Sequence, residues 1–152
     1  MDLTIVDYQP AYQPYFKKFN KAWLEEYFCV EPIDEKVLEH PQENIIDHGG
    51  VILFALYEGE IIGTVALKPV QEGVIELTKM AVDKQRRGFG AGKLLCAYAI
   101  NRARDMGQKK VILYSSSKLR NALGIYRKMG FTEIPLQEGM YGRADIMMAL
   151  SL

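Results

Sequence analysis

The spacing of hydrophobic residues changes along the chain and predicts the order of its secondary structure. Residues 3–6 alternate in the manner of a short strand. Residues 10–28 then carry aromatic and aliphatic side chains three or four positions apart, which predicts an amphipathic helix. We expect this stripe to belong mainly to the core, although the far end of the helix could reach a cleft. A second, shorter helix is expected over residues 32–38, ahead of Pro41.

The middle of the chain predicts three consecutive antiparallel strands. Strand-like runs cover residues 51–57, 61–70 and 74–82, and short turns that contain glycine separate them. Lys79 is the odd residue in the third run, because its neighbours are mostly apolar. A β-bulge that turns this lysine outward would explain its position.

After the third strand the pattern alternates between helices and strands. Helices are expected over residues 91–106 and 119–129, and strands over residues 110–114, 131–134 and 145–150. Because a helix joins them, the strand at 110–114 must run parallel to the strand at 74–82. The predicted fold class is α/β, with a mixed, roughly seven-stranded sheet and helices on both faces.

Length and charge narrow the classes of partner. A chain of 152 residues suits a single domain, and we place its bounds at residues 1–152. Lys plus Arg and Asp plus Glu number 19 each, so no overall field favours nucleic acid or an anionic membrane. The N-terminal residues lack the basic and apolar regions of a signal peptide, and no apolar run approaches the ~18 residues of a membrane helix. We therefore expect a cytoplasmic protein.

Neither a metal site nor a disulfide is expected from the cysteines and histidines. Cys29 and Cys96 are the only cysteines, and each lies in a helix-like stretch without a CxxC motif or a nearby histidine. His40 and His48 lie in loop-like sequence without metal-ligand spacing. The sequence predicts reduced thiols, surface histidines and no bound metal.

A glycine-rich turn between a strand and a helix is the main candidate for chemistry. Gly88, Gly90 and Gly92 lie between the strand at 74–82 and the body of the helix at 91–106. Because glycine has no side chain, successive backbone N–H groups can close on an anion at the positive end of the helix. The basic residues around the turn favour phosphate over a merely solvated loop: Lys84, Arg86, Arg87 and Lys93.

Two familiar nucleotide-binding loops fail on spacing. A P-loop would need glycine at position 87 and a Ser or Thr at position 94, where this chain has Arg87 and Leu94. A dinucleotide-binding fingerprint that starts at Gly88 would need a third glycine at position 93, which is Lys93. Binding of NAD is therefore not expected.

Two motifs resemble those of a known family. One is Gln85-x-x-Gly88-x-Gly90 after an apolar strand, and the other is Asn121-(x)4-Tyr126-(x)3-Gly-Phe about thirty residues later. Over roughly residues 50–150 the chain resembles the GNAT superfamily of acetyl-CoA-dependent N-acetyltransferases. The resemblance implies a GNAT-like fold in which the strand at 74–82 splays from its parallel neighbour and opens a V for the pantetheine arm of coenzyme A.

The resemblance also implies which residues bind acetyl-CoA, the expected cosubstrate. In the family, the amides of the glycine turn hold the pyrophosphate, and the end of the preceding strand pairs with pantetheine. Asn121 matches the family residue that hydrogen-bonds the pantetheine arm. Carried onto this chain, the implied contacts are Met80, Ala81, Val82, Arg87, Gly88, Phe89, Gly90, Ala91, Gly92, Lys93, Asn121 and Tyr126.

Two residues carry the implied catalytic roles. Glu76, in the central strand six residues before Val82, matches the glutamate that often serves as the base; a structural or acceptor-binding carboxylate is the alternative. Tyr126 matches the tyrosine that protonates the thioester sulfur, the alternative being a core tyrosine. The backbone N–H of Val82 matches the group that polarises the acetyl carbonyl. Tyr141 and Arg143, in the last turn, are candidates for contact with the acceptor.

Three functions remain open at this point. The first is an N-acetyltransferase that moves an acetyl group from acetyl-CoA to an amine by direct transfer in a ternary complex. The second is a non-catalytic module that binds or senses acyl-CoA, and the third binds a nucleotide or sugar phosphate through the glycine turn alone. The presence of Glu76, Asn121 and Tyr126 favours the first. The expected partners are acetyl-CoA and an unidentified amine, with a homodimer left open and no nucleic acid or membrane.

Overall fold

One mixed seven-stranded sheet forms the centre of the computed structural model, which describes residues 2–136 and 142–152. The strand order is β1-β2-β3-β4-β5-β7-β6, and the β4–β5 pair is parallel while the other pairs are antiparallel. The α/β prediction is confirmed. The strands are β1 (Leu3–Asp7), β2 (Val51–Tyr57), β3 (Glu60–Gln71), β4 (Val74–Val82), β5 (Lys110–Ser115), β6 (Thr132–Ile134) and β7 (Ile146–Ser151).

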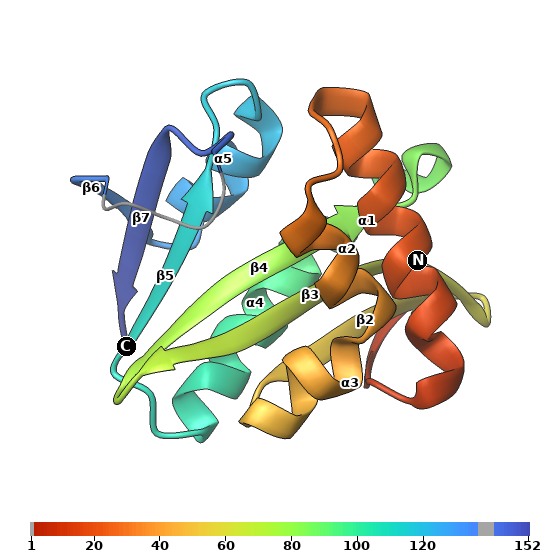
Figure 1. Ribbon diagram of the computed structural model, residues 1–152, viewed down its shortest axis with the longest axis horizontal. Coiled ribbons are helices and arrows are strands. Elements are labelled where there is room, and N and C mark those ends of the chain that lie inside the picture. Colours follow the sequence, from red (N-terminus) through yellow and green to blue (C-terminus); the bar gives the residue numbers. More distant parts are fainter. Residues whose placement is uncertain (1, 137–141) are drawn as a thin grey trace.

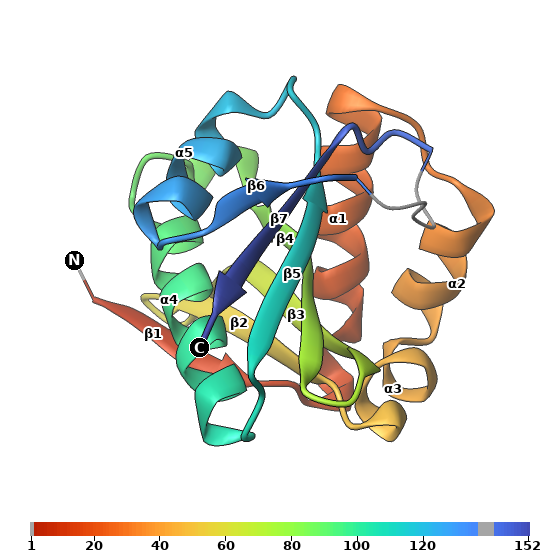
Figure 2. The same ribbon diagram turned by 90° about the vertical axis from the view of Figure 1, so that its left-hand side faces the viewer.

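Helices cover both faces of this sheet, as Figures 1 and 2 show. The helices α1, α2 and α3 lie on one face, and α4 and α5 lie on the other. Their bounds are α1 (Gln13–Tyr27), α2 (Pro32–Glu39), α3 (Pro41–Asn44), α4 (Ala91–Asp105) and α5 (Arg120–Lys128). Short 3-10 turns precede α1 (Pro10–Tyr12), follow α3 (Ile46–His48) and follow β4 (Lys84–Arg86).

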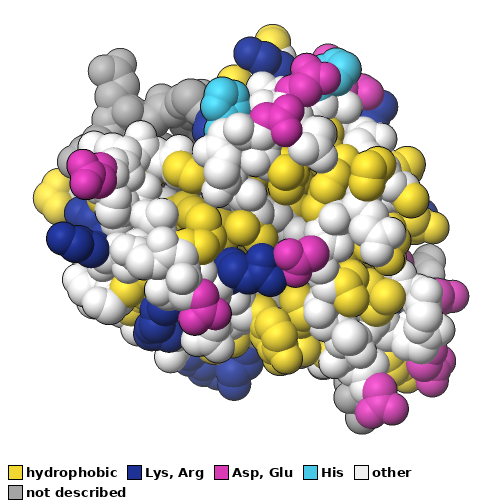
Figure 3. All heavy atoms as spheres, turned by 90° about the horizontal axis from the view of Figure 1, so that it is seen from below, with side chains coloured by type: hydrophobic (Ala, Val, Ile, Leu, Met, Phe, Trp, Pro, Cys, Tyr) yellow, Lys and Arg dark blue, Asp and Glu magenta, His cyan; other side chains and the backbone are white. Residues whose placement is uncertain are grey.

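The short helix α3 was not expected, because residues around His40 and His48 were interpreted as loop. Pro41 starts this helix, since proline is favoured at the first helical position, and the Asn44 amide donates a hydrogen bond to the His40 carbonyl at 2.8 Å. Both histidines are exposed, as predicted, and Figure 3 shows histidine side chains on the surface of one face.

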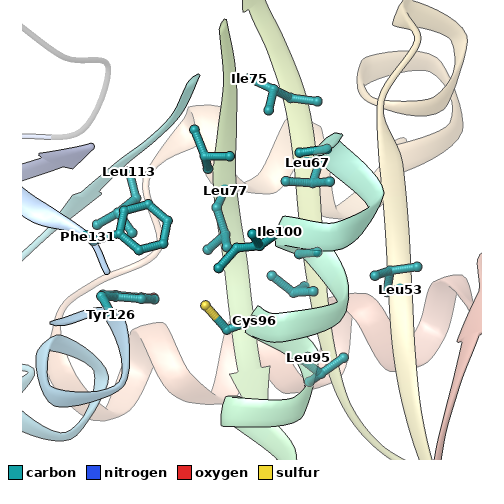
Figure 4. Close-up of a cluster of buried hydrophobic side chains, with 14 of the residues drawn as sticks. Leu53, Leu67, Ile75, Leu77, Leu95, Cys96, Ile100, Leu113, Tyr126 and Phe131 are labelled. Carbon is teal, nitrogen blue, oxygen red and sulfur yellow. The ribbon is translucent and has the colours of Figure 1, made fainter. Parts of the chain in front are cut away.

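A hydrophobic core lies on each face of the sheet. Figure 4 shows the larger one, where Leu53, Leu67 and Leu77 of the sheet face Leu95 and Ile100 of α4. The second core lies under α1 and α2 and is built from Phe16, Leu24, Val37, Leu38, Ile45, Ile52, Phe54 and Ala66. Strand β4 contacts α4 on one face of the sheet and α1 on the other, so its position is fixed from both sides.

The two cysteines differ in their surroundings. Cys96 is buried within the larger core, where burial raises the pKa of its thiol to about 12. Cys29 is exposed and lies after the last turn of α1, not inside a helix as expected. Both thiols are free. Of the helices in the described part of the chain, none is long and apolar enough to span a bilayer.

Strands β4 and β5 separate after a short paired stretch. Their register pairs Val74, Ile75 and Glu76 with Lys110, Val111 and Ile112, and no later pair is formed within the described residues. Figure 1 shows the two strands diverging from this point. The expected V between the parallel strands is therefore present. Beyond Glu76, the β5-facing edge of β4 has no strand partner in the described structure.

The predicted bulge in β4 lies at Lys79, but the lysine does not turn to solvent. The register of β3 against β4 shifts between Thr64↔Ala81 and Ala66↔Thr78, and Lys79 has a left-handed φ of 57°. Its side chain is only 4% exposed because the ammonium lies 2.8 Å from Asp34 Oδ1. The bulge thus directs Lys79 into a buried ion pair with α2.

Candidate active site

A cleft of about 640 Å³ opens where β4 and β5 diverge. Ligands of α/β folds bind at such positions, outside the carboxyl ends of neighbouring parallel strands. The walls come from the last part of α1, β4, the glycine turn, the residues after β5 and the start of α5. Nearly all the candidate residues line this cleft: Glu76, Met80, Ala81, Val82, Arg87, Gly88, Gly90, Ala91, Gly92, Lys93, Asn121 and Tyr126.

Phe89 is the candidate that does not line the cleft. Its ring is 38% exposed and packs beside Tyr57, with 5.9 Å between ring centroids. The Phe89 side chain therefore packs against β2 and not into the cleft. A role of Phe89 in cofactor binding stays a prediction that rests on its backbone alone.

The glycine turn has the geometry of an anion site. Gly88 and Gly90 have left-handed φ values of 92° and 83°, and a Cβ at either position would meet no atom within 4 Å. Gly90 is the N-cap of α4, and the first backbone bond of the helix runs from the Leu94 N–H to the Gly90 carbonyl. The N–H groups ahead of Leu94 have no acceptor within the helix and can bind an anion in the open space.

The two arginines of the turn already pair with carboxylates. Arg87 donates to Glu26 of α1 at 3.0 Å, and this hydrogen bond raises the pKa of Arg87. Arg86 donates to Glu60 at 3.1 Å. Lys93 is exposed, lines the cleft and makes no ion pair with any described residue. The Arg87–Glu26 pair therefore ties α1 to the turn, and of the three basic residues of the turn that line the cleft, Lys93 alone has no ion pair with a described residue.

Glu76 lies at the floor of the cleft. It is the last residue of β4 that pairs with β5, and it is 7% exposed. Burial raises the pKa of Glu76, while the charges of Lys68 and Lys79 and a hydrogen bond with Thr78 oppose the increase. A carboxylate with a raised pKa is a stronger base than an exposed one, so the site suits proton removal.

Tyr114 also lines the cleft and was missed by the sequence analysis. Burial raises the pKa of its phenol, and the charge of Glu76 adds to the increase, which places the two groups close together. The sequence does contain a feature that could have identified Tyr114. It lies near the carboxyl end of the strand expected to run parallel to β4, just before Ser115, Ser116 and Ser117. Side chains at that end of a parallel strand face the ligand.

Tyr126 is buried on α5 with its ring edge against Phe131, 5.9 Å between centroids. Burial raises the pKa of its phenol, so the hydroxyl stays protonated at neutral pH. Among residues 2–136 and 142–152, none hydrogen-bonds to this hydroxyl. Asn121, one turn earlier in the same helix, is exposed at the wall of the cleft. Both polar groups are thus available to a ligand.

A buried ion cluster stands beside Glu76. Asp34 of α2 is fully buried and accepts hydrogen bonds from Lys79 at 2.8 Å and from Arg143 at 2.8 and 2.9 Å. Arg143 also donates to Glu31 at 2.6 Å. Burial alone would raise the pKa of Asp34, but the hydrogen bonds from Arg143 and Lys79 outweigh it and lower the pKa to about 2.

This cluster changes the interpretation of Arg143. Arg143 and Tyr141 were candidates for contact with the acceptor. In the structure Arg143 is bound to Asp34 and Glu31, although it also lines the cleft. Tyr141 lies outside the described residues. The cluster joins α2, the bulge of β4 and the segment before β7, and two of its members, Lys79 and Arg143, line the cleft.

Stability should fall steeply in acid because of Asp34. A carboxyl whose pKa is lowered from 3.8 to about 2 on folding contributes stability above pH 3.8, and this is lost as the pH falls towards 2. The shift corresponds to about 2 kcal/mol, at about 1.4 kcal/mol per pKa unit. Because part of this stability remains at pH 2.5, urea unfolding at pH 5 and pH 2.5 should show that the parent loses about 1.5 kcal/mol more than Asp34→Asn over this interval.

The control for this experiment is Asp7→Asn. Asp7 forms a bidentate ion pair with Arg102, at 2.7 and 2.9 Å, but on the exposed surface, where such pairs contribute little. The stability of Asp7→Asn should therefore fall with pH by about as much as that of the parent. Equal losses in the parent and in Asp34→Asn would contradict the lowered pKa of Asp34.

No group of three or more His, Cys, Asp or Glu side chains that could hold a metal ion is found in the described part of the chain. The described residues that line the cleft include one buried carboxyl, Glu76, and three phenols, Tyr27, Tyr114 and Tyr126.

Comparison with known proteins links this cleft to a family. The model of the acetyltransferase (GNAT) family matches residues 10–131. The Escherichia coli (strain K12) protein named uncharacterized N-acetyltransferase YjgM is 34% identical over 92 residues, which are 59% of this chain and 55% of that protein. The chain thus matches about half the length of that relative.

Solved structures agree with the observed fold. An acetyltransferase of the GNAT family from Staphylococcus aureus Mu50 has a TM-score of 0.88 at 22% identity, over 99% of both chains. The protein yncA from Salmonella typhimurium, solved with its cofactor acetyl-CoA, has a TM-score of 0.79 at 17% identity, over 99% of this chain and 94% of that one. These likenesses show the fold, and the family model covers most of the chain. The protein therefore belongs to the acetyltransferase (GNAT) family.

Proposed function

We propose that this protein is an acetyl-CoA-dependent N-acetyltransferase that transfers the acetyl group directly to an amine in a ternary complex. One observation carries the proposal: a buried glutamate with a raised pKa, a protonated tyrosine and the glycine turn all line one cleft in a chain of the GNAT family. A module that only bound acyl-CoA would need the turn but neither the carboxyl nor the phenol.

The residues present fit acetyl-CoA. The open space above Gly88 and Gly90, with the N–H groups of the first turn of α4, suits a pyrophosphate, and Lys93 adds a positive charge. The free edge of β4 suits the amide groups of the pantetheine arm, which can add to it as a strand would. We assign the arm to Met80, Ala81 and Val82 on one side and to Asn121 on the other.

The direction of one backbone group supports its proposed role. The Asp83 N–H donates to the Ile62 carbonyl of β3 at 2.7 Å. Because successive N–H groups of a strand point to opposite edges, the Val82 N–H is directed to the other edge of β4, which faces the cleft. This group is our candidate for stabilising negative charge on the acetyl oxygen in the transition state.

Each polar group then has one task. When bound, acetyl-CoA supplies the acetyl group as a thioester, whose thiolate is a fair leaving group. Glu76 takes a proton from the amine, directly or through water, and the Val82 N–H donates a hydrogen bond to the developing oxyanion. The Tyr126 hydroxyl returns a proton to the leaving sulfur.

Acceptor-dependent thiol release tests the proposal. The protein would be incubated with acetyl-CoA and a panel of primary amines, with free thiol and the mass of each amine both measured. The expected result is thiol release matched by a product that is heavier by one acetyl group. Tight binding of acetyl-CoA with no thiol release for any amine would favour the binding module instead.

The glycine turn can be tested with a matched pair of variants. Gly90→Ala places a methyl group in the open space and should weaken acetyl-CoA binding at least about tenfold, because the methyl competes with the pyrophosphate. Gly59→Ala is the control: its φ is 79°, a Cβ there also meets nothing within 4 Å, and it lies in the β2–β3 turn outside the residues that line the cleft.

Both alanines carry the same backbone strain of about 1–2 kcal/mol in the left-handed region, so both should lower the melting temperature to a similar extent. Calorimetric titration with acetyl-CoA should separate them. Equal affinities of the two variants would move the pyrophosphate site away from Gly90.

A further inference from the structure

The cofactor contacts above leave part of the cleft unused, and this part is called the second compartment here. Its wall is the end of α1, where Trp23, Tyr27 and Phe28 line the cleft together. The three rings contact one another, with centroids 5.7 Å apart for Trp23 and Tyr27 and 5.8 Å apart for Trp23 and Phe28. This wall suits an apolar or aromatic portion of a small molecule.

The compartment contains one acidic and one basic side chain, Glu76 and Lys118. Glu76 lies at the floor, near Tyr114. Lys118 lies on the wall, with its ammonium 5.3 Å from the centroid of the Phe28 ring. Arg143 also approaches this ring, at 5.9 Å, but it is bound to Glu31 and Asp34. The carboxyl of the compartment and its lysine are thus separate groups that do not pair with each other.

Lys118 makes no ion pair with any described residue. The charge of Lys118 influences the carboxyl of Asp145, but that carboxylate accepts hydrogen bonds at 2.8 and 2.7 Å from the backbone N–H and the hydroxyl of Ser117. Ser116 stands beside Lys118: it is buried, it lines the cleft, and its oxygen accepts the Lys118 N–H at 3.2 Å. Its hydroxyl proton can therefore be donated to a ligand.

We propose that the acceptor is an amine that also carries a carboxylate, as an amino acid does. Its amine lies towards Glu76, its apolar part lies against Trp23 and Phe28, and its carboxylate is bound by Lys118 with the Ser116 hydroxyl. Both ends of such a molecule then meet a complementary charge: the amine meets the buried Glu76, and the carboxylate meets the exposed Lys118. This inference rests on the proposed transferase function and names the class of its acceptor.

Matched pairs of acceptors test the inference. Each amino acid in the panel is compared with its carboxamide, which keeps the amine and the side chain but removes the negative charge. The amide also lowers the pKa of the amine, so the informative quantity is the acid-to-amide ratio of kcat/KM, compared between the parent and its variants.

Lys118→Met should reduce this ratio about tenfold, through a higher KM for the acid, because a hydrogen bond to a charged group is lost. Lys118→Arg keeps the charge and should retain most of the ratio. Lys21→Met is the control: this exposed lysine of α1 is outside the residues that line the cleft, and its ratio should match the parent.

Three results would overturn the inference, and each differs from a failure of the transferase proposal. An unchanged ratio in Lys118→Met would show that the lysine does not bind the carboxylate. A rise in the KM for acetyl-CoA alone would assign Lys118 to a phosphate of the cosubstrate. Efficient turnover of simple amines, with amino acids inactive, would exclude the acceptor class. The absence of thiol release with every amine would instead contradict the transferase function itself.

Discussion

Replacing Tyr126 with Phe should lower turnover by about 10²–10⁴-fold, the usual contribution of general acid catalysis, while acetyl-CoA affinity stays near that of the parent. The change removes only the hydroxyl and keeps the ring against Phe131. Since no described residue hydrogen-bonds to this hydroxyl, its removal breaks no hydrogen bond in the described structure and the melting temperature should barely move. Acceptors for which amine attack limits the rate should show a smaller effect.

Tyr98→Phe provides the matched control. Tyr98 lies on α4, is 49% exposed and is outside the residues that line the cleft, so the same chemical change should leave turnover unaltered. Kinetics and a melting curve on the same preparation separate the two interpretations of Tyr126. Normal turnover in Tyr126→Phe, together with a loss of about 1 kcal/mol of stability, would make it a core tyrosine and end its assignment as the acid.

The strands could be predicted because their signals are local. Short runs of mostly apolar residues mark β2, β3 and β4, and the glycines of the intervening turns show where each strand ends. The glycine turn is local too: its left-handed backbone at Gly88 and Gly90 requires glycine, so residue identity reports geometry there directly. These features need no knowledge of contacts between distant segments.

The ion cluster could not be predicted for the opposite reason. Lys79 and Arg143 both bind Asp34, from which they are 45 and 109 positions away along the chain. No spacing rule links residues so far apart in the sequence. The lysine did stand out in an apolar strand, which was enough to predict the bulge. Its buried partner depends on how α2 packs over β4, and that packing is set by the core under α1 and α2.

The first helix shows a partial success. Its aromatic stripe was predicted to be core with its far end able to reach a cleft. Phe16 and Leu24 are indeed buried in the core under α1. Trp23, Tyr27 and Phe28 line the cleft. Helical spacing reports which residues share a face, but it does not tell where along the helix the sheet beneath it opens, because the separation of β4 and β5 is a property of the sheet.

Replacing Glu76 with Gln should lower kcat/KM near neutral pH by about 10²–10⁴-fold, since the amine must lose a proton before it can attack. An alkyl ammonium with a pKa near 10.4 is about three units from its neutral form at pH ~7.4, which corresponds to roughly 4 kcal/mol. Burial raises the pKa of Glu76 above its ordinary 4.5, so the parent's activity should rise with pH through a pKa above that value.

The glutamine variant has no carboxyl at this position, so the rise in activity that follows the ionisation of Glu76 should disappear from its pH–rate profile. Its remaining activity should increase with pH as free amine is supplied by the solvent. Glu72→Gln removes an exposed carboxyl from the turn just before β4 and should keep the parent's pH–rate profile. A profile that is unchanged in Glu76→Gln would show that Glu76 is structural or that another group that lines the cleft, such as Tyr114, takes the proton.

Stability gives an independent measure of the same carboxyl. A carboxyl whose pKa is raised on folding opposes folding once the pH exceeds its pKa in the unfolded chain, because the buried group resists ionisation. At neutral pH, Glu76→Gln should therefore be at least as stable as the parent, since the neutral amide removes that cost. A variant that loses activity while its melting temperature holds or rises would identify Glu76 as a group kept for chemistry. A large loss of stability would instead show that its hydrogen bond with Thr78 and the charges of Lys68 and Lys79 make it a structural carboxylate.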